Sequence, residues 1–171
     1  MTITVRPGRP DEAALLSDLA LRSKAFWGYD ERFLASCRDE LTLTATEVAV
    51  RRTAVAELNG GAVGFVTVEG TAPIGELGML YVTPEAIGKG VGGELFRHAV
   101  ETARSAGFHR LTIDSDPNAE SFYRAMGAVR VGSVASGSIP GRELPLLAVD
   151  VIPAVGRLSA TPRNPGSPPD A

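Results

Sequence analysis

The feature that most constrains this chain is a glycine-rich segment, GKGVGG, at Gly88–Gly93. It follows an apolar run at residues 75–82 that predicts a strand, and precedes residues 90–106, whose apolar side chains recur at helical spacing. Four glycines in six residues weaken a helix start, but they let the backbone approach a ligand and turn its N–H groups inward. The positive end of the helix dipole adds to this effect. The segment therefore predicts a phosphate-binding or pyrophosphate-binding loop, and a glycine-rich turn without a ligand remains the alternative.

The other elements follow from periodicity and turn residues. A hairpin is predicted at Asn59-Gly60-Gly61, because Asn-Gly supplies the positive φ values of a tight turn. The expected strands are 2–6, the two runs flanking that turn, 75–82, 110–114, 129–135 and 144–151; the expected helices begin at Pro10, resume after Gly28 up to about Leu41, and cover 90–106 and 118–127. This order predicts an α/β (α+β) fold, in which a mostly antiparallel sheet flanked by helices contains one parallel β-α-β crossover.

Composition restricts the class of protein. A chain of 171 residues fits one domain, which we expect to cover residues 1–152, whereas the Pro-, Gly- and Ser-rich residues 153–171 are expected to be disordered. A formal charge of −3 gives no basic surface for nucleic acid or for an anionic membrane. Cys37 is the single cysteine, so no intramolecular disulfide can form. No long apolar run occurs, and we expect a cytoplasmic protein.

The glycine-rich segment also fits the dinucleotide-binding pattern G-x-G-x-x-G, with Asp114 about twenty residues further on. That fold needs several parallel β-α-β units, and this chain supplies one. Four residues, Pro84-Glu85-Ala86-Ile87, also separate the strand from the first glycine. A P-loop is disfavoured as well, because Lys89 is followed by glycine rather than by Ser or Thr.

The longer run LYVTPEAIGKGVGGELF, residues 80–96, resembles the acetyl-CoA-binding motif of the GCN5-related N-acetyltransferase (GNAT) family. The resemblance implies that the backbone of Leu80, Tyr81 and Val82 pairs with the pantetheine arm of acetyl-CoA. It also implies that six backbone amides hold the pyrophosphate, those of Gly88, Lys89, Gly90, Val91, Gly92 and Gly93. One departure is Ile87, which stands where the family usually has Arg or Gln.

A second run, DPNAESFYRAMGA at residues 116–128, resembles a later motif of the same family, although the family's Gly-Phe ending is Gly127-Ala128 here. The resemblance implies that Asn118 reaches the pantetheine and that Tyr123 stands near the sulfur as general acid. A phenol suits this task because its pKa is close to that of the departing thiol. Packing within the helix is the other interpretation of Tyr123. Glu76 occupies a position where many members carry a base, and a solvated carboxylate is an equally good interpretation.

These features predict an N-acetyltransferase that moves the acetyl group of acetyl-CoA to a primary amine by direct attack. The acceptor is an amine of a small molecule, which we favour, or of a protein; Trp27, Tyr29 and Arg142 are the candidate acceptor-binding residues. The alternative function is a CoA-binding module without catalysis. No metal site is expected, because neither His98 nor His109 has a second ligand at metal-binding spacing. Formation of a homodimer is left open.

Overall fold

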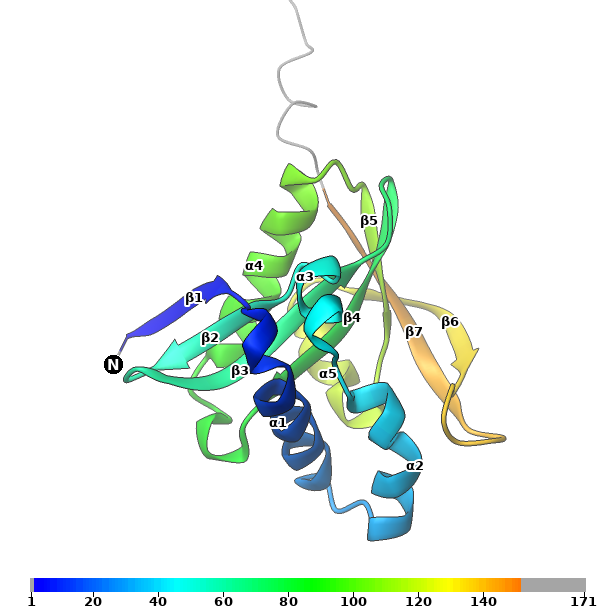
Figure 1. Ribbon diagram of the computed structural model, residues 1–171. Helices are drawn as coiled ribbons and strands as arrows, with labels where there is room; N and C mark the ends of the chain where they lie inside the picture. Colours follow the sequence, from blue (N-terminus) through cyan, green and yellow to red (C-terminus); the bar gives the residue numbers. More distant parts are fainter. Residues whose placement is uncertain (1, 152–171) are drawn as a thin grey trace, which may run out of the picture.

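Residues 2–151 are described by the computed structural model, and within them seven strands form one sheet (Figure 1). The strands are β1 (Ile3–Pro7), β2 (Ala54–Leu58), β3 (Gly61–Glu69), β4 (Ile74–Val82), β5 (Arg110–Asp114), β6 (Val129–Ala135) and β7 (Glu143–Asp150). The α-helices are α1 (Ala13–Ala25), α2 (Glu31–Leu41), α3 (Ala45–Val50), α4 (Val91–Ser105) and α5 (Glu120–Ala125), and 3₁₀ turns at Pro10–Glu12, Pro84–Ala86 and Pro117–Ala119 precede α1, α4 and α5. The predicted disordered tail, 153–171, lies outside the described residues.

The strand order is β1-β2-β3-β4-β5-β7-β6. Neighbouring strands run antiparallel except β4 and β5, which are parallel and are connected through α4. This arrangement confirms the predicted fold class, a mostly antiparallel sheet with one parallel crossover.

Local sequence signals explain two connections. Asn59 and Gly60 have φ values of 53° and 81° between β2 and β3, which is the geometry that the Asn-Gly pair favours in a hairpin. The helix α3 was not predicted from the sequence. Its start is nevertheless marked by a capping box, in which the Thr44 side chain accepts from the Glu47 amide and the Glu47 carboxylate accepts from the Thr44 amide.

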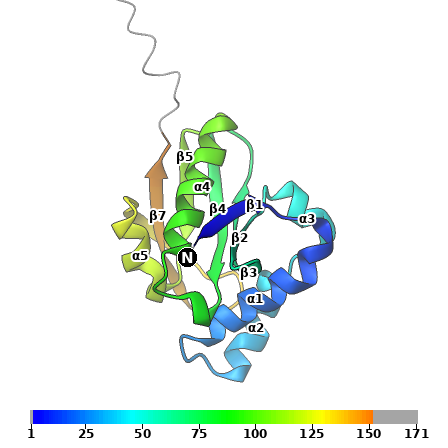
Figure 2. The same cartoon turned by 90° about the vertical axis from the view of Figure 1, so that its left-hand side faces the viewer.

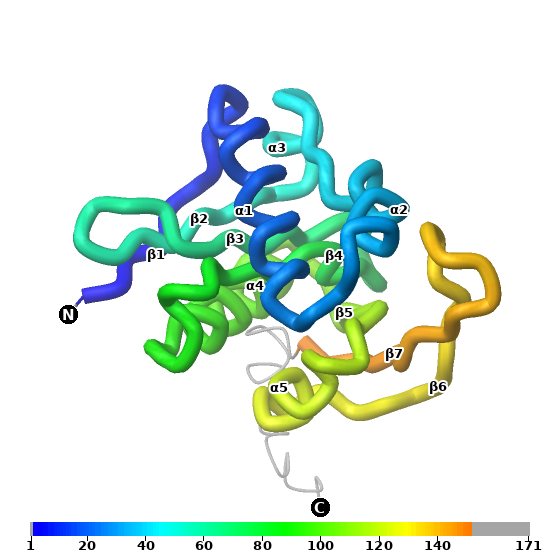
Figure 3. Tube along the Cα trace, turned by 90° about the horizontal axis from the view of Figure 1, so that it is seen from below, coloured from blue at the N-terminus to red at the C-terminus, as the bar shows by residue number. Residues whose placement is uncertain are grey.

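The helices cover both faces of the sheet (Figure 2), and Figure 3 shows α1, α2 and α3 on one side with α4 and α5 on the other. Under α4 and α5 lies the larger core, in which Leu95, Phe108 and Leu111 are fully buried. A second core lies under α1, α2 and α3, where Leu16 and Phe65 are fully buried. Within residues 2–151, no helix combines the length and apolar character needed to cross a membrane.

The parallel pair β4–β5 is short. Within the described residues it joins Ile74–Glu76 to Arg110–Thr112, and the rest of β4, residues 77–82, has no partner on that side. On its other side β4 remains paired with β3 up to Val82. The two strands therefore part, and β4 presents an open edge that runs towards the glycine-rich segment.

Candidate functional site

A pocket of about 770 Å³ lies where β4 and β5 part. Its wall includes β4 residues 76–82, the glycine-rich segment, and the stretch from the end of β5 into α5. Residues of α1, α2 and the β6–β7 loop line it as well. The pocket thus brings both sequence motifs together with segments that lie far from them in the chain.

At one end of the pocket the glycine-rich segment begins α4. Gly88 and Gly90 have φ values of 82° and 86°, a left-handed conformation that glycine adopts without strain. Gly90 is the N-cap of α4, where no side chain caps the helix, and the first helical bond runs from the Glu94 amide to the Gly90 carbonyl. The amides of residues 91–93 therefore have no acceptor within the helix and lie at the positive end of its dipole. They form a site for an anionic group.

Lys89 and Gly92 of this segment both lie close to other parts of the protein. The Lys89 amide donates to the Ala86 carbonyl at 3.3 Å, so this N–H is engaged within the protein. At Gly92 there is little room, because a Cβ atom would stand 3.2 Å from the Phe122 ring. Ile87, the departure from the family pattern, is 42% exposed and lines the pocket.

The open edge of β4 contains the three residues predicted to contact pantetheine. On the β3 side, Leu80 is paired with Val66 and Tyr81 with Phe65. On the pocket side, the alternate N–H and C=O groups of residues 77–82 face the gap left by β5. Such an edge can pair with an extended ligand as a further strand does.

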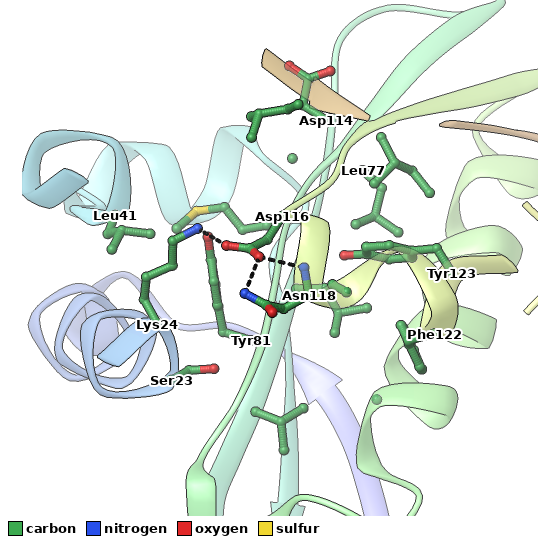
Figure 4. A pocket seen from close by; sticks show the side chains of 18 of the residues that line it. Ser23, Lys24, Leu41, Leu77, Tyr81, Asp114, Asp116, Asn118, Phe122 and Tyr123 are labelled. Atoms are coloured by element: carbon green, nitrogen blue, oxygen red, sulfur yellow. Dashed lines mark hydrogen bonds and ion pairs between the residues drawn. The ribbon is translucent and has the colours of Figure 1, made fainter. Parts of the chain in front are cut away.

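Tyr123 stands on α5, and its side chain enters the pocket with the hydroxyl group pointing inward (Figure 4). The residue is 6% exposed, and within residues 2–151 its hydroxyl has no hydrogen-bond partner. Its ring packs against Phe96 and Phe122. Burial raises the pKa of the phenol, and the charge of Asp116 raises it further, so the hydroxyl keeps its proton at neutral pH.

Glu76 is half-buried on β4, beside Thr112 of β5. In the described part of the chain its carboxylate makes no hydrogen bond or ion pair with another side chain. Burial raises the pKa of Glu76, and so do the neighbouring carboxylates of Asp114 and Glu69, against a smaller opposing effect of Arg51. A raised pKa brings a carboxylate closer to the range in which it can act as a base.

On the other side of the pocket, five polar residues from four segments form what we call the Asp116 cluster: Lys24, Tyr29, Asp116, Asn118 and Arg142. Lys24 lies 2.5 Å from an Asp116 carboxylate oxygen, and the Tyr29 hydroxyl donates to Asp116 at about 3.0 Å. Arg142 and Asn118 each donate to the Tyr29 hydroxyl oxygen, at 2.9 and 3.0 Å. Figure 4 shows the bonds from Lys24 and Asn118 converging on Asp116. The cluster ties α1 and the α1–α2 loop to the β5–α5 and β6–β7 loops.

The Asp116 cluster holds two cations, Lys24 and Arg142, around one carboxylate. Burial alone would raise the pKa of Asp116, but hydrogen bonds from Lys24 and from the Asn118 amide outweigh it, and the net pKa is lowered. By accepting from the Asn118 amide, the Asp116 carboxylate also caps the 3₁₀ turn at Pro117–Ala119. The sequence did not indicate the pairing of Asp116 with Lys24, because 92 positions separate the two residues.

Other predicted residues lie at the margin of the pocket. Trp27 lines it and is 46% exposed, packed edge-on against Phe26. Cys37 is buried, with its Sγ atom 3.6 Å from the Ser138 Oγ atom. Among residues 2–151 no group of His, Cys, Asp and Glu side chains is arranged to hold a metal ion.

Comparison with known proteins agrees with this arrangement. The model of the acetyltransferase (GNAT) family matches residues 19–128, whereas no curated protein matches the chain. A solved GCN5-related N-acetyltransferase from Rhodopseudomonas palustris is similar at 26% identity and a TM-score of 0.71, covering 88% of this chain and 96% of that one.

Two further structures share the fold. PaiA N-acetyltransferase of Thermoplasma acidophilum, solved with coenzyme A, gives a TM-score of 0.72 at 19% identity, covering 88% of this chain and 99% of that one. The ribosomal-protein-S18-alanine N-acetyltransferase of Escherichia coli gives 0.65 at 15% identity, covering 88% and 94%. With the family model matching well over half of its length, the chain belongs to the GNAT acetyltransferase family.

Proposed function

We propose that this protein transfers the acetyl group of acetyl-CoA to a primary amine by direct attack of the amine on the thioester. Family membership supports acetyl transfer in general. The observation that carries the proposal for this chain is the continuity of the open β4 edge with the uncapped start of α4. An extended arm ending in a pyrophosphate, as in CoA, matches that combination of groups.

In this proposal the backbone of Leu80, Tyr81 and Val82 pairs with the pantetheine arm. The amides of Gly88, Gly90, Val91, Gly92 and Gly93 hold the pyrophosphate, and the amide of Lys89 joins them by exchanging its long bond to Ala86. The Asn118 Nδ2 atom is engaged in the Asp116 cluster, so its Oδ1 atom remains to accept a hydrogen bond from the arm.

The chemistry needs a neutral amine and a proton for the departing thiolate. Glu76, directly or through water, accepts the proton that the amine nitrogen loses as its bond to the acetyl carbon forms. Tyr123 donates its phenolic proton to the sulfur as the C–S bond breaks, and the raised pKa of Tyr123 ensures that this proton is present. Positioning of both reactants in the pocket supplies the rest of the rate enhancement.

The acceptor enters on the side of α1, α2 and the β6–β7 loop. We propose that Trp27 borders its entrance and that Arg142 forms part of its wall, with Tyr29 behind the wall accepting a hydrogen bond from Arg142. The Arg142 guanidinium is stacked on the rings of Tyr29 and Phe33 and lies 3.8 Å from Asp116, so it acts mainly by holding the loop in place. We favour a small molecule as the acceptor, which would share this pocket with the acetyl-bearing end of the donor.

The test is thiol release from acetyl-CoA with a panel of amines: diamines, amino acids, aminoglycosides and peptide N-termini. Turnover with at least one amine, together with micromolar binding of CoA by calorimetry, is the expected result. Binding of CoA without amine-dependent thiol release would assign the protein as a CoA-binding module instead. Absence of CoA binding would overturn both assignments.

A further inference from the structure

The charges that line the pocket are unequal. Three cationic side chains line it, Lys24, Arg51 and Arg142, and each has an anionic partner within the protein. Lys24 and Arg142 both approach Asp116, at 2.5 and 3.8 Å. Arg51 lies 3.7 Å from Glu69. Because Lys24 and Arg142 share the single carboxylate of Asp116, these three residues keep one net positive charge. The lining as a whole holds three cations against five carboxylates (Glu40, Glu69, Glu76, Asp114 and Asp116), so its net charge is negative.

The lining also contains three carboxylates without a cationic partner in the described residues: Glu40 of α2, Glu76 of β4 and Asp114 of β5. Leu111 and Ile113 of β5 are buried under α4, so the alternating Asp114 points to the opposite face, as Glu76 does. Glu76 is paired with Thr112, two residues before Asp114, so the two carboxylates lie on the same face of neighbouring strands, and the charge of Asp114 raises the pKa of Glu76.

The carboxylates of Glu40 and Asp114 are close enough for the charge of one to affect the pKa of the other. The pKa of Asp114 is raised by partial burial and by the negative charge of Glu40. The Glu40 carboxylate reaches the β6–β7 loop, where it occupies the space beside Gly137. The three carboxylates thus line one pocket from α2, β4 and β5, and none of them forms an ion pair within residues 2–151, although Arg51 offsets part of the negative charge around Glu76.

The Tyr123 hydroxyl is a second, independent indication that a polar group binds in this pocket. The Tyr123 side chain is 94% buried, and its hydroxyl, aimed into the same pocket (Figure 4), has no hydrogen-bond partner within residues 2–151. Among residues 2–151 the fully enclosed side-chain polar atom without a partner is Thr53 Oγ1, so the Tyr123 hydroxyl is open to the pocket, where a bound polar group can pair with it. An ammonium group beside the acetyl donor would supply a hydrogen bond to the phenol oxygen as well as a counter-charge to Glu76.

We propose that the acceptor is an amine that carries a second positive charge, that is, a diamine or polyamine-like molecule. The reacting amine faces Glu76 and Tyr123, and the second cation faces Asp114 and Glu40. This inference rests on the proposed acetyl transfer and names its acceptor class. Since Glu40 and Asp114 are exposed, each contributes modestly, and the preference comes from the two together.

The test compares three acceptors with the same spacer of four methylene groups: 1,4-diaminobutane, 1-aminopentane and 5-aminopentanoate. They end in a cation, a methyl group and an anion, so their ratios report on the second charge once the diamine value is halved for its two equivalent amines. We expect kcat/KM for the diamine to exceed that for 1-aminopentane by about tenfold or more, with the carboxylate-bearing amine the poorest, because two carboxylates act on the second cation.

The double variant Glu40→Gln/Asp114→Asn should bring the ratio of diamine to monoamine close to one. The matched control is Asp39→Asn, which removes the neighbouring carboxylate of α2 that does not line the pocket, and it should leave the ratio as in the native protein. Melting temperatures of all variants confirm that they are folded.

A ratio near one in the native protein, or a high ratio that survives in the double variant, overturns the inference. Either result leaves the proposed function standing if amines are acetylated. Binding of the three amines in the presence of CoA is measured by calorimetry as well. If no amine is acetylated, the proposed function fails, and the inference is then decided by whether the diamine binds at least about tenfold more tightly than the monoamine.

Discussion

The claim that the start of α4 holds the pyrophosphate can be tested by one pair of substitutions, Gly90→Glu and Gly60→Glu. Gly90 and Gly60 have nearly the same φ, 86° and 81°, and at both positions no atom lies within 4 Å of an added Cβ. The two substitutions therefore impose the same left-handed strain, about 1–2 kcal/mol. Only Gly90 is at the proposed phosphate site, because Gly60 lies in the β2–β3 hairpin.

The expected loss of affinity follows from charge. A carboxylate about 5 Å from one phosphate charge, at an effective dielectric constant of about 20, costs about 3 kcal/mol, or a factor on the order of 10² in Kd. The strain lowers the melting temperature of either variant by about 2–8 °C. In Gly90→Glu the helix dipole offsets part of that loss, because the new carboxylate stands at the positive end of α4.

Calorimetric titration with acetyl-CoA, together with thermal unfolding, separates the two effects. We expect Gly60→Glu to bind as the native protein does and Gly90→Glu to bind on the order of 10²-fold more weakly, with both folded. If the two variants bind acetyl-CoA equally well, the pyrophosphate is not held at the start of α4. If both lose binding equally, backbone strain rather than charge is responsible, and the assignment loses its support.

Three further predictions concern the chemistry and the wall of the pocket. Tyr123→Phe removes an unpartnered hydroxyl, so acetyl-CoA binding and stability should change little while kcat falls on the order of 10²-fold; native-like kcat, with chemistry rate-limiting, contradicts the role of general acid. Glu76 acts as a base only when ionised, and its pKa is raised. With kcat/KM calculated on the concentration of neutral amine, its value should therefore fall with decreasing pH, with a midpoint above the ordinary value for glutamate. Glu76→Gln should abolish this fall, and an unchanged pH profile excludes Glu76 as the base. Asp116→Asn leaves two largely buried cations without a carboxylate and should lower the free energy of unfolding, measured by thermal unfolding, by about 2 kcal/mol. The control Asp18→Asn, in an exposed ion pair, should cost less than about 0.5 kcal/mol. Equal effects would show that the Asp116 cluster does not hold the loops together.

The sequence predicted those parts of the fold that depend on local signals. The glycine-rich segment between a strand and a helix, and the Asn59-Gly60 turn, have backbone conformations that few residues other than glycine adopt, so their geometry follows from the residues themselves. The alternation of apolar and polar residues along β5 and the helical spacing of apolar residues in α4 are local sequence signals as well. The short helix α3 was missed because a six-residue helix has little periodicity, although its capping box at Thr44 and Glu47 was a usable signal.

The acceptor side could not be predicted in the same way. Its wall depends on contacts such as Lys24 with Asp116 and Arg142 with Tyr29, whose partners are 92 and 113 positions apart. No periodicity or motif encodes such pairs, because they form only when α1, the β5–α5 loop and the β6–β7 loop meet. The family motifs lie on β4, α4 and α5, and they predict the donor side of the pocket more fully than the acceptor side.

The short pairing of β4 with β5 has a mechanical consequence. The sheet consists of two half-sheets, β1–β4 and β5–β7, whose hydrogen bonding to each other is limited to the three residue pairs from Ile74↔Arg110 to Glu76↔Thr112. The core under α4 and α5 also connects them, since it contains Leu77 of one half and Leu111 of the other. We expect opening motions of the native state to concentrate at the short β4–β5 junction, where hydrogen bonds are fewest. A ligand that lies along the open edge of β4 adds backbone hydrogen bonds at this junction and makes it more rigid. Its binding energy therefore also resists separation of the two half-sheets. In hydrogen exchange, slower exchange of the amides of residues 77–82 upon addition of CoA would record that stiffening.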